Sequence, residues 1–227
     1  MRMVVRLVIV LAVLALIVAV GVSFAGVMQV PVLSGVFGTN APRDLGEPAP
    51  NQAGYDAIVA VYGIEMPSPE ENYTFASKHT FSGSVDVNQT FTEGEVMAIR
   101  EMGNPAPGIS DVHVRFHDGS AEVAAMVDLA AWGYPLSGPV YGTWSVEVTG
   151  PQALSVSIAS LEFGRVPVPS DLAAQAENAI NSYLSSRLPQ VDGLAIESLE
   201  LREGGIHYTG SLPLTYEAEP PAAGQLP

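Results

Sequence analysis

The sequence predicts an α+β fold: a curved antiparallel β-sheet packed against a long amphipathic helix and a shorter helix, preceded by an N-terminal transmembrane helix. Between residues 111 and 159, apolar and polar residues alternate in successive short runs, which is typical of antiparallel strands with one face in water. Apolar residues recur at helical spacing over 171–188. An uncharged stretch from Leu7 to Pro42 comes before all of these elements.

The N-terminal apolar run is long enough to cross a bilayer. As a helix, Leu7 to Val22 spans about 24 Å, and its continuation to Val32 passes the roughly 30 Å of a hydrocarbon core. Arg2 and Arg6 lie only on its N-terminal side, so the positive-inside rule places that end in the cytoplasm. We therefore expect residues 1–36 to be a single-pass anchor whose partner is the lipid bilayer. The C-terminal domain is then extracytoplasmic.

A cleaved signal peptide is the alternative interpretation of this run. Ser23 and Ala25 are small residues at the two positions that a signal peptidase prefers. The apolar stretch nevertheless continues to Val36, beyond the usual core of a signal peptide, which favours the anchor. Both interpretations deliver the rest of the chain across the membrane.

Composition excludes several classes of function. The formal net charge is −15, from nine Lys and Arg against 24 Asp and Glu, which argues against a nucleic acid partner. The chain has no Cys, so disulfides, thiolate metal sites and cysteine nucleophiles are excluded. About 190 residues follow the apolar run, enough for one domain with a core of its own.

The chain after the anchor divides into three predicted parts. Residues 37–74 read as a juxtamembrane spacer rich in Pro, Asn and Gly, with a short helix over 52–64. Residues 75–214 form the extracytoplasmic α+β domain. Residues 215–227 are expected to be a disordered tail, because the C-terminal end has three prolines and no periodicity.

The domain begins with a weakly alternating strand at 81–87, followed by a short helix. Thr92 and Glu95 predict a capping box, in which each side chain binds the backbone N–H of the other residue. Gly103 supplies a stop for this helix. A β-meander follows, with a tight hairpin turn at Asp118-Gly119 and another turn at Gly150-Pro151.

A long helix and a hairpin complete the domain. Ser170 is the predicted N-cap of the helix and Pro189 ends it. Its predicted apolar stripe comprises Leu172, Ala176, Ala179, Ile180, Tyr183, Leu184 and Leu188. Strands at 194–201 and 206–212 follow, with a bulge between Ile196 and Leu199 where the apolar phase slips.

The order of these elements resembles that of a known family. Its most informative segment is Gly164-Arg165-Val166-Pro167, which runs into the amphipathic helix with strands on both sides. Over roughly residues 81–212 the chain is similar to the YpmS-like and LmeA-like bacterial envelope proteins, which have a TULIP-like lipid-binding domain. The resemblance implies an extracytoplasmic domain that shelters lipid chains between a concave sheet and its helices.

The apolar face of the sheet is the candidate lipid site. A carrier must replace about 0.8 kcal/mol of water exclusion per methylene, or on the order of 10 kcal/mol for a long acyl chain. Small inward-facing side chains across a curved sheet leave room for such a guest, whereas a helix 171–188 that fills the space would leave a closed core. The candidate lipid-contact residues are Val112, Val114, Phe116, Val123, Val127, Trp144, Val146, Leu154, Val156, Ile158, Ile180 and Leu184.

Motifs for catalysis are absent from the sequence, so we expect no enzyme and no cofactor. His113 and His117 share one face of a strand near Asp111, and this trio could hold a divalent metal. A solvated polar face explains the same spacing, so no metal is predicted.

The sequence therefore predicts a membrane-anchored extracytoplasmic protein that binds lipid acyl chains. The alternative is a non-catalytic envelope interaction module that binds a protein or wall polymer through its acidic face. The sequence does not identify a protein partner.

Overall fold

The computed structural model describes residues 39–48, 78–102, 108–128 and 136–219, with single positions between them at 53, 54, 56, 59 and 130. The predicted anchor, residues 1–36, lies outside the described residues. Within the described part, no helix combines the length and apolar character that crossing a membrane requires. The described positions from 53 to 59 are helical, within the short helix predicted over 52–64.

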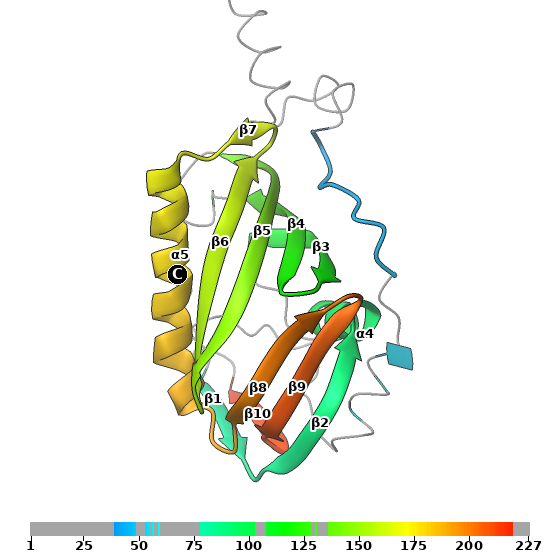
Figure 1. The fold of residues 1–227 in the computed structure, drawn as a ribbon, viewed down its shortest axis with the longest axis vertical. Coiled ribbons are helices and arrows are strands. Elements are labelled where there is room, and N and C mark those ends of the chain that lie inside the picture. Colours follow the sequence, from blue (N-terminus) through cyan, green and yellow to red (C-terminus); the bar gives the residue numbers. More distant parts are fainter. Residues whose placement is uncertain are drawn as a thin grey trace, which may run out of the picture.

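The fold is α+β, built from antiparallel sheets and helices, with most residues in strands (Figure 1). The described strands form three sheets instead of the single sheet that the sequence predicts, in the orders β1-β10, β2-β9-β8 and β3-β4-β5-β6-β7. The elements are β1 Lys78–Ser82, β2 Val85–Thr92, α4 Glu93–Met102, β3 Ile109–His117, β4 Ser120–Asp128, β5 Ser137–Gly150, β6 Ala153–Phe163, β7 Val166–Pro167, α5 Ser170–Arg187, the 3-10 helix η2 Leu188–Gln190, β8 Ala195–Arg202, β9 Gly205–Leu212 and β10 Thr215–Glu219.

Two predictions about the ends of the domain are wrong. The strand predicted over 81–87 is divided between β1 and β2, because Gly83 turns the chain there at φ +69°. The tail predicted to be disordered from residue 215 begins with β10, Thr215–Glu219, which pairs with β1 in antiparallel register, and its remainder, 220–227, lies outside the described residues. Thr215 and Tyr216 favour strands, and β1 offers them an open edge.

The predicted start of α4 is confirmed. The Thr92 N–H donates to Glu95 Oε2 over 2.8 Å, and the Glu95 N–H lies 3.4 Å from Thr92 Oγ1, which completes the capping box. The predicted stop at Gly103 lies outside the described residues. Met97 and Ala98 are buried, so this helix contributes to the core.

The predicted meander is confirmed, and its hairpins determine which side chains share a face. Asp118 and Gly119 turn the chain between β3 and β4, with Gly119 at φ +77°. Directly paired residues project on the same side of an antiparallel sheet. The register pairs Val114 with Val123 and Val146 with Val156, so the apolar positions fall on one side.

The meander joins the β2-β9-β8 sheet through hydrogen bonds between two hairpin turns. The Gly119 N–H donates to the Leu201 carbonyl over 3.0 Å, and the Gly204 N–H donates to the Phe116 carbonyl over 3.1 Å. The buried carboxylate of Glu93 accepts the Phe116 N–H over 2.7 Å. These bonds fix the start of α4 and both turns as one unit.

A second contact between the meander and the β2-β9-β8 sheet is apolar. Val87, Ile196 and Tyr208 form a buried cluster on the β2-β9-β8 sheet, and Val148 and Leu154 from the end of the β5–β6 hairpin pack against it. Burial raises the pKa of the Tyr208 hydroxyl to about 12. The Tyr208 oxygen lies 2.9 Å from the Ala195 carbonyl oxygen, so the buried hydroxyl is satisfied.

Helix α5 differs from its prediction. Pro169 is the N-cap, Ser170 makes no capping hydrogen bond, and no residue of α5 is buried. Leu172 and Tyr183, predicted to belong to the apolar stripe, are exposed. The helix lies alongside β6, the strand nearest to it (Figure 1).

The β8–β9 hairpin, in contrast, follows its prediction and has its bulge between Ile196 and Ser198.

We expect Glu93→Ala to lower the free energy of unfolding by about 1–3 kcal/mol, because it leaves the buried Phe116 N–H without an acceptor. Glu93→Gln keeps an oxygen at the same position and should retain most of the stability. Urea unfolding followed by tryptophan fluorescence measures both variants. An equal loss in the two would contradict this role for the carboxylate.

Candidate functional site

The strand register brings most of the candidate lipid-contact residues onto one face of the β3–β6 meander. Trp144 pairs with Ala121 on one side and Ile158 on the other, and Leu154 pairs with Val148. Val127 pairs with Ile109. Val112 is the exception, because it falls where the β3 register shifts and has no directly paired residue. We call this side of the meander the apolar face.

The apolar face is only half closed. Phe116, next to α4, is 4% exposed, whereas all the other candidate residues are half-buried. In an ordinary closed core most such side chains would be fully buried. The face therefore keeps part of its Val, Leu and Ile surface available to something other than the protein's own side chains.

Helix α5 forms a wall at the edge of this face and does not cover it. The Asn181 side chain binds both backbone groups of Val156, each over 2.8 Å, and Glu177 Oε2 accepts the Ile158 N–H over 2.8 Å. These polar side chains satisfy the free backbone groups of β6, which would otherwise be an unpaired sheet edge. Ile180 is three residues after Glu177, and Leu184 is three residues after Asn181. Both apolar side chains therefore lie on the side of α5 that faces the sheet edge.

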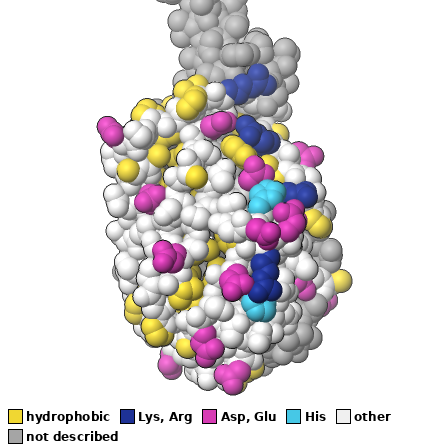
Figure 2. All heavy atoms as spheres, in the orientation of Figure 1, with side chains coloured by type: hydrophobic (Ala, Val, Ile, Leu, Met, Phe, Trp, Pro, Cys, Tyr) yellow, Lys and Arg dark blue, Asp and Glu magenta, His cyan; other side chains and the backbone are white. Residues whose placement is uncertain are grey.

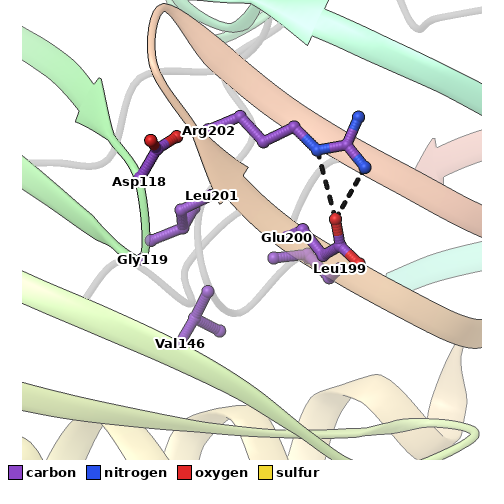
Figure 3. Close-up of a pocket in the computed structure, with 7 residues that line it drawn as sticks. All are labelled: Asp118, Gly119, Val146, Leu199, Glu200, Leu201 and Arg202. Carbon is purple, nitrogen blue, oxygen red and sulfur yellow. Dashed lines mark hydrogen bonds and ion pairs between the residues drawn. The ribbon is translucent and has the colours of Figure 1, made fainter.

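A pocket of about 510 Å³ opens where β5 parts from β4 and passes β8. Figure 3 shows Val146 of β5, the Asp118-Gly119 turn and the end of β8 around it. Leu199 and Leu201 add apolar lining, and the Arg202 guanidinium is held by Glu200 at 2.6 and 3.1 Å. Val146 is the candidate lipid-contact residue that this pocket includes.

The opposite face of the meander was predicted to lie in water, but residues 39–48 cross part of it. We call this segment the strap. Arg43 binds Glu162 over 3.0 Å and lies 3.6 Å above the centre of the Tyr141 ring. Arg115 donates to the carbonyl oxygens of Leu45 and Gly46. The start of the predicted spacer is therefore docked on the sheet.

The strap buries small residues beneath it. Ala124, on this face of β4, is 0% exposed, and Thr39 of the strap is also buried. The Glu47 carboxylate binds the His113 ring and is itself almost fully buried. The strap ends near the start of α4: a Cβ atom added to Gly94 would lie 3.7 Å from the Pro48 Cβ.

His113 and His117, which with Asp111 were possible metal ligands from the sequence, contact different carboxylates. His113 binds Glu47 and lies 3.4 Å from Asp111, whereas His117 lies between Glu203 at 3.1 Å and Glu122 at 3.3 Å. The described residues contain no group of three or more His, Asp or Glu placed to hold a metal ion. The histidines therefore connect parts of the fold: His113 binds the strap and His117 binds the β8–β9 turn.

A short chain of polar contacts links these groups across the strands. The Tyr141 hydroxyl donates to Glu122, and this bond, together with His117, lowers the pKa of the Glu122 carboxyl. Hydrogen bonds to Glu203 and Glu122 raise the pKa of the His117 imidazole. Figure 2 shows basic, acidic and histidine side chains gathered in a band along one face of the molecule.

Comparisons with protein-family models, with curated proteins and with solved structures found no match to this chain. The resemblance to lipid-binding envelope proteins therefore stays a prediction from the sequence.

Sequence reasoning missed the strap and the β8 side of the pocket. The sequence signal for the strap was the pair Arg43 and Asp44. These are the first charged residues after the long uncharged stretch, and they lie in a segment rich in Pro, Asn and Gly. The pocket residues Leu199 and Leu201 were visible as a strand, but their approach to β5 depends on long-range packing.

His117 should make stability depend on pH. Because its pKa is raised in the folded state, its contribution is fully present below the unfolded value of about 6.5 and is lost as pH rises through the folded pKa. We expect His117→Gln to reduce the difference in unfolding free energy between about pH 5.5 and about pH 8.5. Urea titrations at both values test this. An unchanged difference would show that the His117 contacts do not persist in solution.

Proposed function

We propose that this chain is a membrane-anchored extracytoplasmic protein that binds a lipid acyl chain along the apolar face of the β3–β6 meander. The observation that carries the proposal is the half-buried state of that face. Val114, Val123, Val146 and Val156 project from one side of the sheet and none is fully covered. The position of α5 at the sheet edge explains why the face stays open.

The energetics favour a hydrocarbon guest. Each methylene removed from water contributes about 0.8 kcal/mol, so a long acyl chain needs an extended apolar surface and not a small pocket. The apolar face runs along β5 and β6. These strands pair over most of their lengths, from Val140 with Phe163 to Gly150 with Ala153. An acyl chain lying along these strands would cover side chains that water now contacts.

The anchor belongs to the same proposal. The run from Leu7 to Val36 supports membrane attachment, with the arginines on its N-terminal side supporting an outward domain. A protein tethered in this way stays close to the lipid that it binds. The absence of recognisable catalytic motifs supports binding over catalysis.

A matched pair of substitutions tests the site. Val146→Trp places a large ring on the half-open apolar face. Glu147→Trp places the same ring at the next residue of β5, which is exposed on the opposite face of the sheet. We expect Val146→Trp to reduce uptake of a fluorescent fatty-acyl phospholipid several-fold while the urea midpoint changes little. Glu147→Trp should leave both unchanged.

The competing closed-core interpretation makes the opposite prediction. In a sealed interior the added ring of Val146→Trp would overpack and cost about 1–3 kcal/mol of stability. Strong destabilisation by Val146→Trp, together with an organic extract of the purified full chain that holds no stoichiometric lipid by mass spectrometry, would overturn the proposal. Salt-sensitive capture of a protein or wall polymer by the same lipid-free chain would then favour an interaction module.

A further inference from the structure

Two of the four large hydrophobic side chains that are exposed among the described residues lie near one end of the molecule; the other two, Tyr183 and Leu214, lie elsewhere. Val166 of β7 is 44% exposed and Leu172 in the first turn of α5 is 53% exposed. We call residues 164–172 the tip. It lies at the upper end in Figure 1, and hydrophobic side chains reach the surface at that end in Figure 2. Large apolar side chains left in water at one end of a small domain indicate contact with a partner.

The strap limits how far this tip can lie from the end of the apolar run. Arg43 is bound to Glu162 over 3.0 Å, and Glu162 pairs directly with Pro167 of the tip. The apolar run ends at Val36. Even a fully extended chain places Arg43 at most about 25 Å from that residue. If the run is embedded in a bilayer, the tip cannot lie far from the surface of that bilayer.

The charge around the tip also suits a membrane surface. Arg43 and Arg165 stand there against Asp44, Glu162 and Asp171, a net charge of −1, whereas the chain as a whole carries −15. A domain this acidic is repelled by anionic headgroups, and the repulsion is weakest where its net charge is smallest. The tip is therefore the end of the domain best able to approach a bilayer.

The apolar face is continuous with the tip. Phe163 of β6 pairs with Val166 of the tip on one side and with Val140 of β5 on the other. Leu161 and Ile158 follow on the same strand and are half-buried. A hydrocarbon chain could pass from the tip onto this face without crossing a polar barrier on β6.

We infer that the tip docks on the outer surface of the membrane that holds the anchor, with Val166 and Leu172 inserted among the lipid headgroups, and that lipid enters the apolar face at this end. The inference rests on the proposed function, because it uses both the anchor and the acyl site. It adds the orientation of the domain on the membrane and the route of the lipid.

The lack of cysteine in the chain makes a direct test possible. Val166→Cys, Leu172→Cys and, as a control, Leu214→Cys each give the full chain one thiol for an environment-sensitive fluorophore. Leu214 is also an exposed apolar residue, but it precedes β10, at the end of the domain away from β7 (Figure 1). The labelled chains are reconstituted in phosphatidylcholine–phosphatidylglycerol vesicles, with and without a lipid that carries a quencher near its headgroup.

The inference predicts blue-shifted emission and several-fold stronger quenching at positions 166 and 172 than at 214. If the chain floats with the vesicles and its extract contains lipid, but the three positions are quenched equally, the tip inference is overturned and the proposed function stands. If the chain does not float with the vesicles, both are overturned.

A second pair of variants tests the route of entry. We expect the double variant Val166→Asp/Leu172→Asp to slow transfer of a fluorescent phospholipid from vesicles several-fold while the final amount bound is unchanged. Leu214→Asp is the matched control and should change neither. Because the substituted side chains are exposed, folding should be preserved, which circular dichroism checks. An unchanged transfer rate in the double variant would contradict entry at the tip.

Discussion

The structure depends on how the free edge of β6 is satisfied. Backbone groups of Val156 and Ile158 bind the side chains of Asn181 and Glu177, which fixes α5 beside the sheet and not on top of it. The antiparallel register meanwhile directs the small apolar side chains of β3 to β6 to one face. Because α5 lies along the edge of β6, the apolar face stays half open, and the proposed acyl site follows from this arrangement.

The strap and the turn contacts hold the rest of the domain in place. Residues 39–48 cover part of the opposite face through Arg43, Arg115 and Glu47. The rest of that face is polar and lies in water, as the exposed Glu147 and Ser157 show. The β3–β4 and β8–β9 turns join through backbone hydrogen bonds, which position the second sheet at the other end of β5. The strap also brings the start of the described chain to the end where the tip lies.

Local features were predictable and long-range ones were not. The capping box at Thr92, the turn at Gly119 and the bulge near Ile196 are determined by residues close in sequence, and all three are present. The strap depends on Arg43 and Glu162, which are 119 residues apart. The apolar stripe of α5 was predicted only in part: Ile180 and Leu184 are half-buried, whereas Leu172 is exposed. The sequence did not show that polar side chains of the helix, Glu177 and Asn181, would satisfy the β6 edge.

The central claim is that hydrocarbon lies on the apolar face, and photolabelling tests it most directly. A phospholipid with a diazirine near the end of its acyl chain is incorporated into membranes that contain the full chain, and the cross-linked peptides are mapped by mass spectrometry. The account predicts adducts on β5 and β6, at Val146, Val156 or Ile158, that an excess of unlabelled lipid removes. Adducts confined to the strap or to the outward side of α5, or insensitive to that excess, would contradict it.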